Sequence, residues 1–151
     1  IEVFPVAHDA PETIGFHIVA GDKKITIVTD LGHICETAAP YIRAANMLVI
    51  ESNYDEQMLE NGIYPHFLKA RIRSDHGHLG NHQTSAFLAD IAGENLHHIC
   101  LAHLSNKNNT PEIALQTLRQ TFAERGISTN GQLRISVLNR HMPSEVIRLN
   151  E

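Results

Sequence analysis

Short apolar runs, bounded by turn residues, alternate along the chain with segments whose apolar positions recur at helical spacing. The runs have the length and the β-branched content of strands. Two of them, Met47–Ile50 and Ile99–Ala102, are apolar at every position, which is typical of strands covered on both faces. The predicted strands are Val3–Val6, Phe16–Ala20, Lys24–Thr29, Met47–Ile50, Ile99–Ala102 and Leu133–Leu138, with a short final strand at Val146–Leu149.

Local signals place the helices and one tight turn. Thr110 as N-cap, Pro111 at the first helical position and Gly126 just past the end predict an amphipathic helix. The other predicted helices are Asn81–Ala92, Thr37–Ala45 and Pro65–Ile72, and Ala20–Lys23 predicts a hairpin turn. Strands that alternate with helices predict an α/β fold with mixed sheets covered by helices. No linker divides the chain, so we expect residues 1–151 to form a single domain.

Composition narrows the class of protein without deciding its function. The 151 residues contain 42% apolar residues, enough for one buried core, and no run of about 18 apolar residues predicts a membrane span. The two cysteines, Cys35 and Cys100, are too few for a disulfide framework and favour a reducing compartment, so we expect a cytoplasmic protein. The net charge of −5 argues against broad adhesion to nucleic acid, but it allows a local basic patch or a metal ion that supplies positive charge.

Polar side chains follow four of the predicted strands at the point where each strand ends. These residues are His8 and Asp9, then Asp30, then Glu51 with Ser52 and Asn53, then His103 with Ser105. Reactive groups of α/β sheets gather where strands end and loops begin. Imidazole and carboxylate groups are ligands of zinc and manganese, and a carboxylate between two metal ions can bridge them. The conjunction indicates a dinuclear metal site.

Each of these residues also has a simpler interpretation. Asp30 before Gly32 is equally suited to capping a turn, and a single histidine such as His8 or His103 is more often a hydrogen-bonded structural residue than a ligand. Two further groups of polar residues have two possible roles each. Glu51, Asn53 and Asp55 orient ligands or cap the next helix, with capping slightly favoured, and Lys69, Arg71 and Arg73 contact phosphates or form a solvated face.

Six motifs, in order, carry a family resemblance: VAHDA, IGFHI, IVTDLG, IESNYD, YPHFLKARIRSDHGHLGN and LAHLSNKNN. The chain resembles the C-terminal part of the metallo-β-lactamase-fold hydrolases of the YycJ/WalJ group, which is similar to the PhnP and RNase Z phosphodiesterases. The resemblance implies an αββα sandwich with two divalent metal ions, zinc or manganese, in the intact protein. On the family pattern His8 is a ligand of one ion, Asp30 the bridging carboxylate and His103 a ligand of the other ion.

The family's HxHxDH motif, which supplies most ligands of both ions, is absent from this sequence. The stretch Asp75–His82, DHGHLGNH, does not replace it, because Gly80 occupies the position that requires an aspartate. We therefore expect an incomplete ligand set and weak metal binding by this chain alone. The resemblance includes GHLGN outside the metal motifs, so His78 is assigned with Asp30 to the catalytic residues, as a proton-transferring or substrate-proximal group at the edge of the site. Capping of the following helix is an equally good role for His78.

These observations support three functional hypotheses. The first is a metal-dependent phosphodiesterase, a nuclease of DNA or RNA, that uses a hydroxide bound to the dinuclear centre. The second is a non-catalytic fragment or interaction module that pairs with a missing N-terminal half or with another copy. The third is a small-molecule hydrolase on the same fold. No GxSxG or GxxxxGK[ST] motif points to a serine hydrolase or a nucleoside-triphosphate enzyme.

Overall fold

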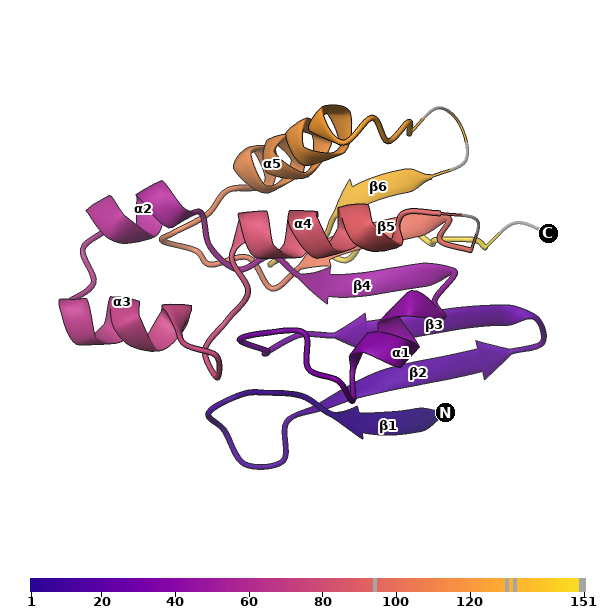
Figure 1. Ribbon diagram of the computed structural model, residues 1–151, viewed down its shortest axis with the longest axis horizontal. Helices are drawn as coiled ribbons and strands as arrows, with labels where there is room; N and C mark the ends of the chain where they lie inside the picture. The colour runs from indigo at the N-terminus through magenta and orange to yellow at the C-terminus, as the bar shows by residue number, and fades with distance from the viewer. Residues whose placement is uncertain (94, 130, 132, 150–151) are drawn as a thin grey trace.

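The computed structural model describes residues 1–93, 95–129, 131 and 133–149. Within these ranges six strands form one sheet in the order β1-β2-β3-β4-β5-β6 (Figure 1). Their bounds are β1 Glu2–Pro5, β2 Ile14–Ala20, β3 Lys23–Val28, β4 Met47–Glu51, β5 His98–Ala102 and β6 Arg134–Val137. The first three strands pair antiparallel, whereas β3 to β6 pair in parallel. The mixed α/β architecture that the sequence predicts is confirmed.

Among the described residues, five helices accompany the sheet: α1 Ala39–Arg43, α2 Glu56–Asn61, α3 His66–Arg73, α4 Asn81–Ile91 and α5 Pro111–Glu124. In Figure 1, α1 and α4 lie in front of the sheet, and α2 and α3 project beyond the ends of its strands. Sequence reasoning did not predict α2, a helix of six residues. None of the helices among the described residues has the length and apolar character needed to cross a membrane.

The predicted final strand Val146–Leu149 is wrong, because the structure has no strand there. The side chain of Val146 is 83% exposed, and these residues have no ladder partner in the part of the chain that the structure describes. Strand preference depends on packing against cross-strand neighbours, and a short segment without them does not form a strand.

One face of the sheet packs on the helices and forms the core. Leu48 and Ile50 of β4, with Ile99 and Leu101 of β5, are fully buried with Leu118 of α5 in a single apolar cluster. Burial of large aliphatic side chains contributes roughly 1.5–3 kcal/mol each, so this cluster fixes β4 and β5 firmly. The two strands whose ends carry Glu51 and His103 are therefore the best anchored in the sheet.

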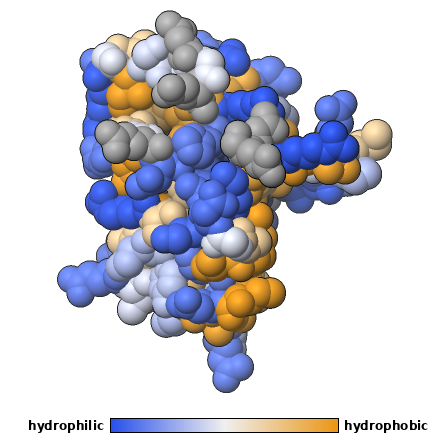
Figure 2. Space-filling view, turned by 90° about the vertical axis from the view of Figure 1, so that its right-hand side faces the viewer, coloured by the Kyte–Doolittle hydropathy of each residue, from blue (hydrophilic) through white to orange (hydrophobic). Residues whose placement is uncertain are grey.

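Across β1 to β4 the opposite face of the sheet carries apolar side chains, and on β1 and β2 these side chains are exposed. The ladder places Val3, Phe16, Ile27 and Val49 side by side across β1 to β4, on the face that points away from α1. Val3 is 57% exposed and Phe16 is 40% exposed. Apolar side chains line the lower right-hand edge of the view in Figure 2. An exposed patch of this kind marks a contact surface more often than a solvent face.

Candidate metal centre

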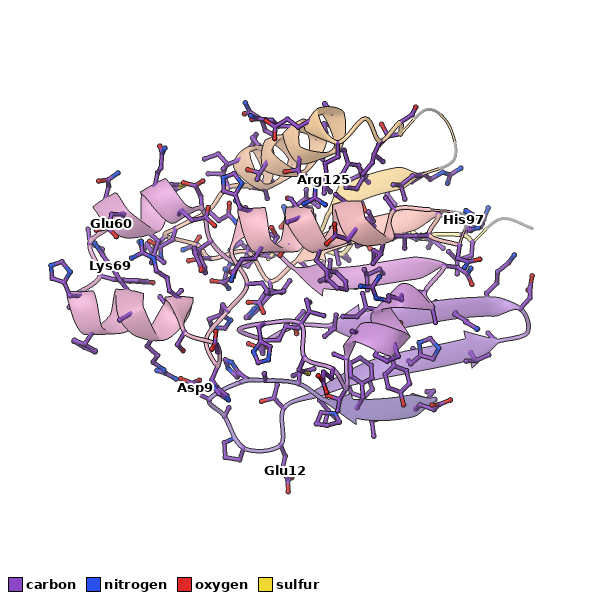
Figure 3. The ribbon with its side chains drawn as sticks, in the orientation of Figure 1. Asp9, Glu12, Glu60, Lys69, His97 and Arg125 are labelled. Carbon is purple, nitrogen blue, oxygen red and sulfur yellow. The ribbon has the colours of Figure 1, made fainter. Side chains whose placement is uncertain are left out.

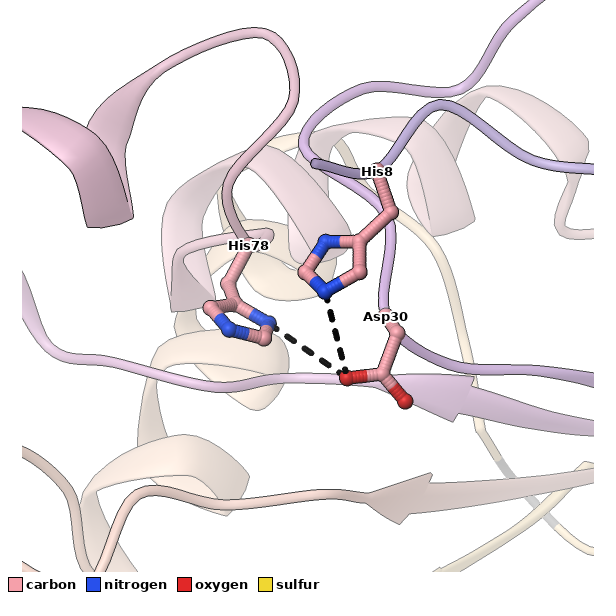
Figure 4. A group of neighbouring side chains, drawn as sticks. All are labelled: His8, Asp30 and His78. Carbon is pink, nitrogen blue, oxygen red and sulfur yellow. Dashed lines mark ion pairs between the residues drawn. The ribbon is translucent and has the colours of Figure 1, made fainter. Parts of the chain in front are cut away.

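Five titratable side chains from separate segments meet at one end of the sheet. His8 follows β1, Asp30 follows β3, Glu51 ends β4, His103 follows β5, and His78 lies in the loop before α4. Because β3, β4 and β5 are parallel, their carboxyl ends lie at the same edge and bring three of these residues together. Figure 4 shows His8 and His78 directed at the Asp30 carboxylate.

The Asp30 carboxylate faces three imidazoles through a single oxygen. Its Oδ1 lies 3.9 Å from Nε2 of His8, 4.0 Å from Nδ1 of His78 and 3.6 Å from Nε2 of His103. These separations exceed hydrogen-bond lengths, so the four groups converge without bonding to one another. Two sets of donor atoms, each within 4.8 Å of one another, have the composition of a metal site: His8, Asp30 and His78, and Glu51, His78 and His103.

Each imidazole is held through its Nδ1 atom. Nδ1 of His8 bonds the Gly77 carbonyl at 2.9 Å. The Glu51 Oε1 atom receives Nδ1 of His78 at 2.6 Å and Nδ1 of His103 at 3.1 Å. Histidine ligands of metals commonly donate one ring N–H to a carboxylate or carbonyl and coordinate through the other nitrogen. His8 and His103 follow this pattern, with Nε2 of each toward Asp30, and therefore fit divalent ions of the zinc or manganese kind, whereas His78 uses Nδ1 toward both Glu51 and Asp30.

Glu51 is a buried charge with three donors. Its side chain is fully buried, and besides the two imidazoles its Oε2 accepts a bond from the Leu31 N–H at 3.0 Å. Burial raises the pKa of Glu51, but the hydrogen bonds from His103 and His78 outweigh it, and the pKa is lowered overall. The hydrogen bond between Glu51 and His103 raises the pKa of His103, and burial of the imidazole opposes that change. The carboxylate is thus ionised and acts as a fixed acceptor.

Two of the site residues have strained backbones. Asp30 has a φ of 58° and His103 a φ of 55°, both in the left-handed region. Aspartate and histidine tolerate this region better than most residues, at a cost of roughly 1–3 kcal/mol. Neighbouring contacts hold the strained turns: Gly32 N bonds the Ala7 carbonyl at 2.8 Å, and Asn53 Nδ2 bonds the His103 carbonyl at 2.8 Å. Strain at a cluster of potential ligands is a common feature of functional sites.

A buried network of amides fixes the loops beneath the site. The side chains of Asn81 and Asn109 bond each other, with Nδ2 of Asn109 2.8 Å from Oδ1 of Asn81 and Nδ2 of Asn81 3.0 Å from Oδ1 of Asn109. Asn109 also donates to the Ser52 carbonyl at 2.8 Å, and the Ser52 hydroxyl bonds Asn81 at 2.6 Å. The network joins the loops after β4 and β5 to the start of α4, and so it holds Glu51, His78 and His103 in one frame.

Two of the three basic residues of α3 contact α2, and the third lies beside the candidate site. Lys69 is buried and donates to the Glu60 carbonyl of α2, and Figure 3 shows these two residues on facing helices. Arg73 pairs with the Glu60 carboxylate at 2.7 Å. Arg71 alone of the three lines a cavity of about 350 Å³ beside His8 and His78, where it forms a bidentate pair with Asp9. The Arg71 pair lowers the pKa of Asp9.

The structure brings together His8, Asp30, His78 and His103, and it places with them Glu51, for which the sequence left a ligand-orienting role open. His78 lies within the cluster and does not cap α4, because its side chain bonds Glu51, while the N–H of Gly80 at the start of α4 donates to the Gln83 side chain at 2.9 Å. The favoured capping role is correct for Asp55, which accepts from Met58 N at 2.8 Å, but wrong for Glu51, whose carboxylate faces the histidines. The sequence signal that could have found this role of Glu51 is its position as an acid at the end of an apolar strand. A carboxylate buried there requires hydrogen-bond donors, and the nearby histidines supply them.

A mixed sheet with a helical layer, and a His, Asp and Glu cluster where its parallel strands end, define an α/β protein of the metallo-β-lactamase-like class. No family model matches the chain. It is 35% identical over 146 residues, which is 97% of the chain and 55% of the relative, to exodeoxyribonuclease YycJ of Bacillus anthracis. It is also 35% identical over 124 residues, 82% of the chain and 46% of the relative, to exodeoxyribonuclease WalJ of Streptococcus pneumoniae. The chain is homologous to the YycJ/WalJ exodeoxyribonucleases, a metallo-β-lactamase-fold family, and spans about half the length of these curated relatives.

Proposed function

We propose that the intact protein is a metal-dependent nuclease of DNA that hydrolyses phosphodiester bonds at the cluster of Asp30 and the three imidazoles. The proposal is carried by one observation: Oδ1 of Asp30 lies 3.6–4.0 Å from three imidazole nitrogens without a hydrogen bond to any of them. The names of the relatives support DNA as the substrate. The acidic net charge of −5 agrees with a site that depends on bound cations to attract a phosphodiester.

His8, Asp30 and His103 would hold the two ions, with Asp30 as the bridging carboxylate. Zinc or manganese ions bound there would activate a water molecule and neutralise the charge of the phosphodiester. His8 and His103 are suited to this role because Nδ1 of each is already occupied and Nε2 of each faces Asp30. Residues outside this chain would complete the ligand set.

His78 is the proposed proton-transferring residue. It lines the cavity beside the cluster, and its Nδ1 atom is fixed by the ionised Glu51 carboxylate at 2.6 Å. An adjacent carboxylate fixes the tautomer and the orientation of the ring, which a proton-transferring imidazole requires. Glu51 therefore positions His78 to deliver a proton to the leaving oxygen, while its fully buried side chain excludes water from the other side of the ring.

Substitution Asp30→Asn in the intact protein tests the proposal. It retains the size of the side chain but removes the charge, so manganese- or zinc-dependent hydrolysis of single-stranded DNA should fall at least about 100-fold, with loss of bound metal measured by elemental analysis. Asp22→Asn, in the exposed turn between β2 and β3, is the matched control and should keep both. Undiminished hydrolysis by the Asp30 variant would refute the assignment.

The apolar open face of the sheet favours a second candidate, an interaction module. Val3, on the edge strand β1, is 57% exposed, and Phe16 beside it on β2 is 40% exposed. Edge strands such as β1 pair readily with another chain. If this is the sole function, the intact protein will bind no stoichiometric metal, and the Asp30→Asn variant will behave as the unaltered protein does in hydrolysis and in association.

A further inference from the structure

Two cavities lie on either side of the loop that follows His103. The first, of about 350 Å³, contains His8 and His78. The second, of about 450 Å³, contains His103 and the start of α5. Both are lined by Ser105, Asn106 and Arg140. The candidate metal centre therefore opens into two adjoining spaces with one cation at their boundary.

Arg140 is held at this boundary by the backbone. Its guanidinium donates to the carbonyl of Leu104, the residue directly after His103. None of the carboxylates in the described part of the chain pairs with it. Arg71, which also lines the first cavity, differs in this respect because Asp9 neutralises it. Of the two arginines that line these two cavities, Arg140 is thus the one whose charge is available to a ligand.

The chemistry at the boundary suits a phosphate. A guanidinium presents five N–H donors in a planar fork, and the Leu104 carbonyl occupies only part of that fork. The Ser105 hydroxyl oxygen accepts from the N–H of Asn108 at 3.2 Å, which leaves its own proton free to donate. The Asn106 side chain adds a further polar group to both cavities. Arginine forks of this kind recognise phosphate by paired, charge-assisted hydrogen bonds.

We propose that Arg140 binds a phosphate of the DNA strand next to the scissile one, so that consecutive nucleotides occupy the two cavities on either side of the Ser105–Asn106 loop. This inference rests on the proposed nuclease function and extends it: the substrate is a strand with at least two phosphates, and Arg140 sets that preference. A substrate with a single phosphodiester reaches the metal centre but not Arg140.

The experiment compares two thymidine oligonucleotides in the intact protein with manganese: a dinucleotide with one phosphodiester and a trinucleotide with two. The quantity measured is the ratio of kcat/KM for the longer substrate to that for the shorter one. Incomplete folding or metal loading lowers both values equally, so the ratio reports only the added phosphate contact. In Arg140→Gln this ratio should fall about tenfold, and in Arg140→Lys, which keeps the charge without the fork, it should fall less.

Arg119→Gln is the matched control, because Arg119 lies on the exposed side of α5 outside both cavities. It should leave the ratio unchanged. On longer single-stranded DNA, the plot of log KM against log salt concentration should also be shallower for the Arg140→Gln variant. The slope should decrease by the amount expected for the loss of about one phosphate contact. An unchanged ratio and an unchanged salt slope in an active Arg140→Gln protein would overturn the inference and leave the nuclease function standing. Absence of hydrolysis by the unaltered protein would instead refute the proposed function itself.

Discussion

Replacing Glu51 by Gln removes a buried charge while it preserves the shape of the side chain. The fully buried carboxylate accepts three hydrogen bonds, from His78, His103 and the Leu31 N–H. A glutamine retains one acceptor oxygen. If that oxygen stays with the imidazoles, its amide group opposes the Leu31 N–H, so that donor meets donor.

The magnitude follows from these contacts. A buried N–H left without a partner costs roughly 1–3 kcal/mol, and hydrogen bonds to a charged acceptor lose about half their strength when the charge is removed. We expect Glu51→Gln to lower the free energy of unfolding by about 2–4 kcal/mol. Because the imidazoles lose the acceptor that orients them, metal affinity should also fall about 10–100-fold.

Urea unfolding of the metal-free intact protein measures the first effect, and competition with a chelator measures the second. Glu60→Gln is the control, since its carboxylate is 57% exposed and bonds Arg73 on the surface, where ion pairs contribute little. A Glu51→Gln protein whose free energy of unfolding lies within about 0.5 kcal/mol of the unaltered one, with metal affinity unchanged, would refute the reasoning.

The remaining predictions concern positions outside the ligand cluster. Burial, with a contribution from Arg134, lowers the pKa of His98, so the unfolded chain takes up a proton first as the pH falls. The free energy of unfolding should therefore decline below about pH 6.5, the ordinary pKa of histidine. His98→Gln should flatten this decline in urea unfolding at several pH values, and an equal dependence on pH in the two proteins would contradict the prediction. Asn109→Ala should cost about 2–4 kcal/mol in the same assay, because the amide makes bonds to Ser52, Asn53 and Asn81; a loss under about 1 kcal/mol would show that the network is dispensable. The isolated chain should associate as its concentration rises in light scattering, and Phe16→Ser should weaken the association; a monomer at all concentrations would show that the open face is inert.

The elements that the sequence predicted correctly are those whose signals are local. Helix α5 begins at the predicted cap, where the Thr110 hydroxyl accepts from Ile113 N at 3.2 Å, and ends before Gly126, whose φ of 67° suits glycine. Helix α2 was missed because six residues carry too little periodicity to distinguish a helix from a loop. Val146–Leu149 was overpredicted for the opposite reason, since its local preference for strand has no neighbour to pair with.

In the candidate site too, the sequence predicts the residues whose position follows from the strands and does not predict the position of a residue in a loop. The meeting of Asp30 and His103 was predictable, because parallel strands deliver their ends to one edge of a sheet. The place of His78 depends on how a loop 27 residues further along the chain folds back onto Glu51, and no local pattern specifies that contact. The stretch DHGHLGNH illustrates the difference. Of its three histidines, His82 is exposed on α4, and only His78 enters the cluster.

Glu51 connects the stability of the fold to the chemistry of the site. A fully buried carboxylate stays charged only where donors meet it, and here two of its three donors are imidazoles. An ionised carboxylate can only accept, so His78 and His103 must both carry a proton on Nδ1. That requirement leaves the Nε2 lone pair of His103 facing Asp30, which is the tautomer that a metal ligand needs. The contacts that stabilise the buried acid therefore also prepare the ligand atoms before an ion arrives.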